Sequence, residues 1–289
     1  MKIAKVLNNN IAIAVNDRGK DVIVMGCGIA FQKRHGDEVD ESKIERLFSQ
    51  NVPALSRRFG ELVAEIPEEY FEAAQSIVAN AKMTLGRDLD DNIYLTLTDH
   101  IYFTIERFRK GMAIHNRLLL ETKMIYREEF GVAMEALDYL NKRFGVELPE
   151  DEAAFIALHL VNADSGASMT QTFEITRMVQ EINALIRNYF KREISSESLA
   201  YYRLMVHLKF FATRVVTSGS ANHDDFEDRQ LFDLIKTQYA ESYRCAERVR
   251  AFIEKTYDVT VGENEEMYLT IHIERVFGRS STGPDQEPV

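Results

Sequence analysis

The sequence has little cysteine, no tryptophan and no long apolar run. Its 289 residues include only two cysteines, Cys27 and Cys245, which cannot build the disulfide framework of a small secreted scaffold. No apolar stretch approaches the roughly 20 residues that a membrane-spanning helix needs. The first residues alternate between apolar and polar and lack the apolar core of a signal peptide. We therefore expect a protein of the reducing cytoplasm, without membrane insertion.

Negative charge dominates the chain as a whole but not its first part. The formal net charge is −11 at pH 7, which by itself argues against nucleic-acid binding. Residues 1–35, however, hold six lysines and arginines against two aspartates, a balance of +4, so the remainder carries −15. A basic segment joined to an acidic body indicates a nucleic-acid module attached to something else, although six basic side chains can equally form a solvated strand face.

Residues 1–31 show the period-2 pattern of β-strands. Asparagine-rich and glycine-containing segments interrupt the pattern where turns are expected. The pattern predicts three strands, at residues 3–7, 11–15 and 22–25, and two turns, at residues 8–10 and 16–19. We expect a short fourth strand at residues 29–31. So small a sheet buries too little surface to be secure alone, so a partner surface or a dimer is expected.

From about Ile44 the apolar period becomes helical and continues through most of the chain. Small polar residues between Ala163 and Thr172 predict a linker between two helical halves, and residues 218–228 predict a loop. Residues 278–289 lack an apolar period and are expected to be disordered.

The two helical halves resemble each other. A shift of 107 residues aligns Tyr94, Leu97, His100, Phe103 and Arg107 with Tyr201, Leu204, His207, Phe210 and Arg214. A shift of 113 residues aligns Glu150, Glu152 and His159 with Glu263, Glu265 and His272. Duplication of a helical domain of about a hundred residues explains both alignments.

Four of the seven histidines occupy matched positions, namely His100, His159, His207 and His272. Their apolar neighbours one helical turn away place them at the edge of a core or at an interface. A single histidine of this kind is most often a buried residue bonded to backbone, but imidazole at both sites of both halves favours a function. Neutral imidazole is nucleophilic near pH 7 and can accept a phosphoryl group, which brings roughly two negative charges. Such histidines are interpreted as switches.

Metal and enzyme interpretations fit the sequence less well. No histidine pair has i, i+4 spacing, and no Cys-x-x-Cys accompanies the histidines. The tripeptide His272-Ile273-Glu274 lacks the downstream cysteines of a deaminase, and His223-Asp224 is unrepeated. The segment Gly26-Cys27-Gly28 lacks the third glycine of a dinucleotide site. We expect no metal, no cofactor and no catalytic residue.

Seven segments together carry a family resemblance. They read MKIAKVLNNN, VMGCGIAFQKR, GDEVD, LTDHI, LPEDEAAFIALHLVNA, YYRLMVHLKFF and YLTIHIERV. In combination they resemble the BglG/SacY/LicT family of bacterial transcriptional antiterminators, from Met1 to about Phe277. The LicT-like regulators of β-glucoside operons are particularly similar.

The resemblance implies a multidomain protein. It consists of a small antiparallel β-sheet co-antiterminator (CAT) RNA-binding domain at residues 1–55 and two homologous all-α PTS regulation domains (PRDs), helical bundles, at residues 65–170 and 171–277, with a disordered tail at 278–289. It further implies a homodimer, not an enzyme, that binds a leader-mRNA hairpin. Binding prevents a terminator from forming, so transcription proceeds into sugar-utilisation genes.

The resemblance also assigns roles to the histidines. His100 and His159 match the pair whose phosphorylation by the sugar-specific permease, enzyme II, inactivates the protein. His207 and His272 match the pair that receives phosphate from the phosphocarrier protein HPr, which activates it.

Six residues near the start of the chain correspond to the RNA-binding positions of the family: Lys5, Asn8, Asn10, Gly26, Cys27 and Phe31. Asparagines can read unpaired base edges, glycine permits close backbone approach, and a phenylalanine stacked on a base contributes about 1–3 kcal/mol. Without the resemblance, a plain turn for the asparagines, a bulge for Gly26 and a core position for Phe31 would be the favoured interpretations. Cys27 departs from the family, which usually has arginine there. We expect this change to lower the salt dependence of RNA binding by about one charge, a log-log slope of roughly 0.7–0.9.

A DNA-binding transcriptional activator containing PRDs is the alternative. It would require a helix-turn-helix near the start of the chain, where the period-2 pattern predicts strands.

Overall fold

The computed structural model describes residues 1–44, 46–48, 66–112, 114–166, 168–192, 194–195, 198–221 and 229–278. The chain divides into two compact units. The first unit comprises Met1–Ile114 and Val132–Gly166, and the second comprises His115–Gly131 and Ala167–Val289. The predicted disordered tail beyond Gly278 and most of the predicted loop at 218–228 lie outside the described residues.

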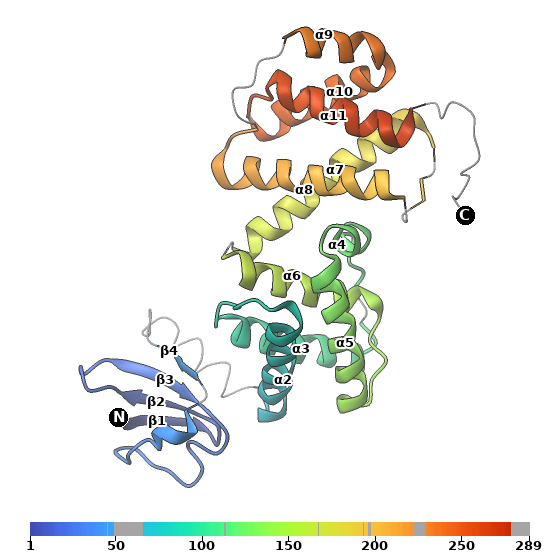
Figure 1. Cartoon of the computed structure of the whole chain (residues 1–289). Coiled ribbons are helices and arrows are strands. Elements are labelled where there is room, and N and C mark those ends of the chain that lie inside the picture. Colours follow the sequence, from blue (N-terminus) through green and yellow to red (C-terminus); the bar gives the residue numbers. More distant parts are fainter. Residues whose placement is uncertain are drawn as a thin grey trace, which may run out of the picture. The chain divides into compact units, whose positions relative to one another are not determined.

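The first 48 residues form a four-stranded antiparallel sheet in the order β1-β2-β3-β4, coloured blue in Figure 1. Its strands are β1 (Lys2–Asn8), β2 (Ile11–Val15), β3 (Asp21–Met25) and β4 (Arg46–Phe48). The three strands and two turns expected from the alternating pattern are confirmed.

Two expectations for this region are wrong. Residues Ile29–Phe31 form turns instead of a fourth strand, since Gly28 adopts a φ of +63° and breaks the extended path. The fourth strand is β4, which lies where the helical period was expected to begin, after a short 3₁₀ turn η1 (Glu41–Lys43). A three-residue strand is too short to show alternation, and its pairing with β3 defines it.

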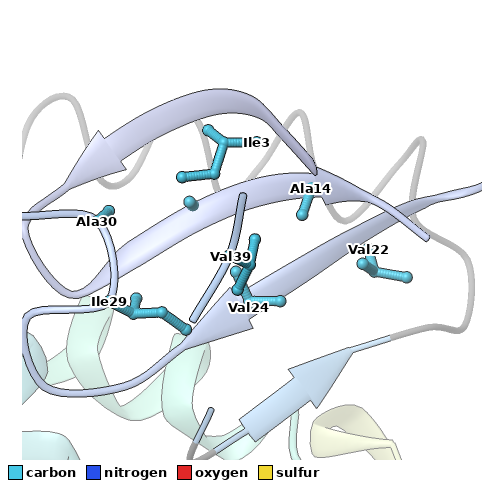
Figure 2. Close-up of a cluster of buried hydrophobic side chains, with 8 residues drawn as sticks. Ile3, Ala14, Val22, Val24, Ile29, Ala30 and Val39 are labelled. Carbon is cyan, nitrogen blue, oxygen red and sulfur yellow. The ribbon is translucent and has the colours of Figure 1, made fainter. Parts of the chain in front are cut away.

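Apolar side chains cover both faces of the sheet. One cluster, seven of whose eight residues are labelled in Figure 2, contains Ile3, Ala12, Ala14, Val22, Val24, Ile29, Ala30 and Val39. On the opposite face Ile11, Ile23 and Met25 are also buried, which the register explains because Ile11 lies opposite Met25. Small alanines on β2 let the segments around residues 29–30 and 39 approach the sheet closely.

The chain after β3 returns to bond with β1. The Ile3 amide donates to the Asp37 carbonyl at 2.8 Å, and the Gly36 amide donates to the Ile3 carbonyl at 2.8 Å. The Val39 amide donates to the Met1 carbonyl at 3.0 Å. Residues 36–39 therefore run beside β1 and hold Val39 in the core.

Among the described residues, the helices of the first unit are α2 (Glu68–Leu85), α3 (Ile93–Arg109), most of α5 (Arg127–Phe144) and α6 (Glu150–Ser165). Helix α3 packs against both α2 and α6. Proline precedes α2 and α6, and left-handed Gly86 and Gly166 end them, as expected for residues that start and stop helices.

The helices of the second unit are α4 (Leu119–Ile125), the first residues of α5, α7 (Met169–Phe190), α8 (Leu199–Ser218), α9 (Arg229–Gln238), α10 (Ala240–Tyr257) and α11 (Glu263–Phe277). Helix α8 packs against α7 and α11, and α10 lies beside α11 (Figure 1). Helix α4 packs against α7 and α8. None of the described helices is long and apolar enough to cross a membrane.

The expected break between the two helical halves lies within residues 163–172, where the compact units divide, but the predicted linker is too long because most of this span is helical. Helix α6 continues to Ser165, and α7 begins at Met169. Ser168 and Gln171 form a reciprocal capping box, in which each side chain accepts from the backbone amide of the other. Three residues separate the two helices, and the expected domain boundary at 170/171 falls in the first turn of α7.

Candidate functional site

Two loops at one end of the sheet form a single bonded surface, the N-terminal loop surface, made of residues 8–10 and 26–31. Asn10 joins them. Its carbonyl accepts from the Gly26 amide at 3.0 Å, and its side-chain Oδ1 accepts from the Gly28 amide at 2.5 Å. The Ala30 amide donates to the Asn9 carbonyl at 2.9 Å. The asparagines thus fix the shape of both loops.

The side-chain amides of the three asparagines differ in their partners, and Asn9 Nδ2 donates to Glu68 Oε2 at 3.5 Å. Asn8 Oδ1 accepts from the Asn10 amide at 2.9 Å, as in an Asx turn. Asn8 Nδ2 is buried and has no hydrogen-bond partner among the described residues. An unpaired buried donor costs about 1–3 kcal/mol, which a ligand acceptor would recover.

The structure brings most of the predicted RNA-binding residues to this surface. Asn10, Gly26 and Cys27 lie on the bonded loops, with Gly26 buried and Cys27 exposed. Phe31 follows in the next turn and is 57% exposed, so it is not a core residue. Lys5 is exposed on β1 opposite Ile13 and takes no part in the bonds between these loops.

Helices α3 and α6 bring the first pair of histidines together. His100 and His159 have ring centroids 5.1 Å apart, and His100 Nε2 lies 3.4 Å from Glu152 Oε2. Arg107 Nη2 lies 3.5 Å from Glu152 Oε1, and Thr104 donates to Glu152 Oε2 at 3.1 Å. These five residues are the first histidine site.

Helices α8 and α11 repeat this arrangement. His207 and His272 stack with ring centroids 4.7 Å apart, and His207 Nε2 lies 3.5 Å from Glu265 Oε2. Arg214 Nη2 donates to Glu265 Oε1. These four residues are the second histidine site. The four histidines are half-buried, as expected for the edge of a core.

Burial keeps one imidazole of each pair neutral. Desolvation lowers the pKa of His159 well below its ordinary value, and proximity to His100 lowers it further. Desolvation, with smaller contributions from His207, Arg275 and Arg203, lowers the pKa of His272 to about 4. A neutral ring has a lone pair available for nucleophilic attack at pH 7.

Sequence reasoning missed the carboxylates and guanidinium groups as site members. Glu152 and Glu265 are buried, and Arg107 and Arg214 pair with them. The signal was present, since all four aligned in the repeat. The spacing within α3 is also informative. Arg107 lies seven positions after His100, about two helical turns, so both side chains lie on one helix face. Within the described residues, no group of histidine, cysteine and carboxylate side chains could hold a metal ion.

Comparison with known proteins matches these parts to two domain families. Residues 1–54 match the CAT RNA binding domain, and residues 75–163 and 177–276 match the PRD domain. The chain is 46% identical over 276 residues to transcription antiterminator LicT of Bacillus subtilis, covering 96% of this chain and 99% of LicT. It is 42% identical over 276 residues to the β-glucoside operon antiterminator of Dickeya chrysanthemi, covering 96% of each chain.

The chain belongs to the CAT–PRD family of transcription antiterminators. A crystal structure of GlcT CAT-PRDI is similar to it, with a TM-score of 0.52 and 31% identity, covering 57% of this chain and 98% of that one. The predicted family and the predicted fold class are confirmed. The four-stranded sheet belongs to the CAT domain, and the two helical repeats are PRDs. Residues 115–131 lie within the first PRD by sequence but belong to the second compact unit.

Proposed function

We propose that this antiterminator acts as a cytoplasmic homodimer in a sugar-utilisation operon, most simply one for β-glucosides. Its CAT domains bind a hairpin in the leader mRNA and prevent an overlapping terminator from forming. Phosphorylation of the first histidine site by the sugar-specific permease, enzyme II, inactivates the dimer. Phosphorylation of the second site by HPr activates it. The protein itself carries no catalytic activity.

The observation that carries this proposal is the occurrence of the same paired-imidazole site in both PRDs. Each site places two rings within about 5 Å beside a buried glutamate. A phosphoryl group added there introduces negative charge next to that carboxylate, in surroundings that screen charge poorly. The packing of the two helices that form the site must then change.

The chemical step is transfer between imidazoles. The lone pair of a neutral acceptor ring forms a nitrogen–phosphorus bond while the nitrogen–phosphorus bond of the donor phosphohistidine breaks. The donor ring keeps that electron pair and takes up the proton that the acceptor ring releases through solvent. The lowered pKa values of His159 and His272 keep those rings in the reactive neutral form.

RNA binding is assigned to the N-terminal loop surface. Phe31 offers an exposed ring for base stacking, while Asn10 offers an amide donor for base edges. One such surface makes few contacts, so two heads held in a dimer bind through raised effective concentration. A change in PRD packing caused by the added phosphate charge can therefore control the affinity for the hairpin, although the PRDs themselves do not bind the RNA.

Phosphopeptide mapping tests the regulation. The full chain is incubated with phosphoenolpyruvate, enzyme I and HPr, with and without a β-glucoside permease. We expect phosphate on His207 or His272 with HPr alone, and on His100 or His159 only when the permease is present. Absence of phosphate from both second-site histidines would contradict the activation half of the proposal.

Gel-shift titration with a leader hairpin tests the RNA part. We expect the phosphorylated second site to tighten binding of the hairpin and to leave duplex promoter DNA unbound. Preference for duplex DNA would favour the alternative activator. The described residues 1–44 and 46–48 form strands and contain no helix-turn-helix, which disfavours that alternative.

A further inference from the structure

The two histidine sites differ at one matched position. Thr104 of the first site corresponds in the repeat to Phe211 of the second, one turn beyond His100 and His207 respectively. Phe211 is buried, so an apolar ring occupies the place of a hydroxyl. The other polar members of the two sites are identical.

Thr104 completes the bonding of the first site. Its hydroxyl donates to Glu152 Oε2 at 3.1 Å and accepts from Arg107 Nη2 at 3.0 Å. Glu152 is therefore held by a neutral donor as well as by Arg107. Arg107 is in turn held by Thr104 as well as by Glu152, so moving Arg107 to another acceptor would break both contacts.

The second site lacks this support. Among the described residues, Glu265 Oε2 accepts no hydrogen bond, and the buried Arg214 Nε finds no acceptor. Both sites leave imidazole nitrogens unpaired, but among the described residues only the second also leaves a buried carboxylate oxygen and a buried guanidinium nitrogen without a hydrogen bond. His207, Phe211 and Glu265 also line a small cavity of about 10 Å³, which is room for roughly one water molecule.

The unpaired Arg214 Nε suits a phosphoryl group on either ring of the second site. Phosphate brings three acceptor oxygens, and a guanidinium binds them through two parallel donors. The Glu265 carboxylate, 3.5 Å from His207 Nε2, would be repelled by the same phosphate. Arg214 would then bind the phosphoryl group, which is the stronger acceptor, and Glu265 would lose its hydrogen bond from Arg214.

We propose that Arg214 holds the phosphoryl group once His207 or His272 carries it and releases Glu265 in exchange, whereas Thr104 prevents the equivalent exchange at the first site. This inference rests on the proposed function and specifies its switching element. Arg214 is a positioning residue, since it acts on the modified ring and not on the transfer itself. The exchange is the change in packing between helices α8 and α11 that follows phosphorylation of the second site.

The test compares full-length variants before and after phosphorylation by phosphoenolpyruvate, enzyme I and HPr. Arg214→Lys keeps the positive charge but removes the two parallel donors. Phe211→Thr installs the hydroxyl of the first site, and Phe211→Val removes the ring without adding a hydroxyl. Mass spectrometry measures phosphate on His207 and His272, and hairpin titration measures the ratio of dissociation constants before and after phosphorylation. Thermal melting checks that each variant is folded.

We expect phosphorylation to tighten hairpin binding of the parent chain at least about fivefold. In Arg214→Lys, phosphate is still incorporated but the gain falls below about twofold, and the ³¹P resonance of the phosphohistidine shifts relative to the parent. Phe211→Val keeps most of the gain, whereas Phe211→Thr loses it. An unchanged gain in phosphorylated Arg214→Lys, or equal gains in the two Phe211 variants, would overturn this inference and leave the proposed function intact. Absence of phosphate from the parent chain would overturn both.

Discussion

At Asn10 a single side chain serves both the fold and the candidate RNA surface. Its Oδ1 accepts from the Gly28 amide, so only its amide group is left to meet a ligand. These two roles can be separated because aspartate keeps the acceptor oxygen and lacks the donor.

We therefore predict different outcomes for two substitutions of Asn10. Asn10→Asp should leave the melting temperature nearly unchanged while weakening hairpin binding, since the donor is lost and a negative charge is added. Asn10→Ala should lower the free energy of unfolding by about 1–2 kcal/mol, because the Gly28 amide loses its partner. Calorimetry and hairpin titration check both. Equal loss of stability in the two variants would mean that Oδ1 does not hold the loop.

Phe31 is predicted to contribute to binding but little to stability. Its ring is 57% exposed, so Phe31→Ala should change the free energy of unfolding by less than about 1 kcal/mol. Loss of one stacked base should cost about 1–3 kcal/mol of binding, a roughly 5- to 150-fold higher dissociation constant. Phe31→Tyr keeps an aromatic face and is the matched control. Unaltered hairpin binding by Phe31→Ala would exclude stacking.

At the scale of elements, the packing of α8 against α11 buries His272, and this burial disfavours its protonated, charged form. The pKa of His272 is lowered to about 4, against about 6.5 when unfolded. Between these values the unfolded chain binds a proton that the folded chain does not, so stability falls as pH falls through that window.

His272→Gln should remove this dependence. We expect the parent chain to lose about 1–3 kcal/mol more unfolding free energy than the variant between pH 6.5 and 4. Denaturant titration at several pH values measures the difference. Burial raises the pKa of Glu121 and Glu266, which changes stability in the opposite direction, but their contributions cancel between the two proteins. Parallel pH profiles would show that His272 is not held neutral by the fold.

The elements that could be predicted from sequence are those defined by local patterns. The alternation of apolar and polar residues predicted β1 to β3, and the internal repeat predicted which histidines form pairs. The length of the linker was overestimated because Ser165, Gly166 and Ser168 are small and polar. Ser168 and Gln171 nevertheless match the sequence pattern of a capping box, which marks the start of α7. Strand β4 could not be predicted, since pairing with β3 defines it. The glutamate and arginine partners of the histidines were visible only as repeat matches, because their ion pairs form between distant helices.

At the scale of the whole molecule, the two compact units do not follow the order of the chain. Residues 115–131 pack in the second unit, where Gln180 Nε2 donates to the Arg117 carbonyl at 2.5 Å and Lys209 Nζ lies 4.4 Å from the Tyr126 ring centroid. Local sequence patterns do not reveal such long-range packing. We therefore expect residues 115–131, a segment of the first PRD, to unfold together with α8, the helix that carries His207.

Hydrogen exchange should reveal this arrangement. Met178→Ala, at a fully buried position of α7, should destabilise the second unit by about 2–5 kcal/mol. We expect amide exchange in α4 to accelerate together with that in α8, while exchange in α2 is unchanged. Leu97→Ala in α3 is the reciprocal control and should accelerate α2 but not α4. Exchange of α4 that follows α2 instead would contradict the assignment of residues 115–131 to the second unit.

The pairing of residues 36–39 with β1 has a consequence for assembly. Backbone groups of β1 that would otherwise face outward are already bonded within the chain, at Ile3 through Asp37 and Gly36. A second copy therefore cannot pair with the backbone of β1 at Ile3 unless these bonds break, and pairing along an exposed edge strand is a common route to unwanted fibres. Two CAT domains that associate beside Ile3 would do so through side chains, whose shape and charge can select the correct partner and can be separated without unravelling a strand.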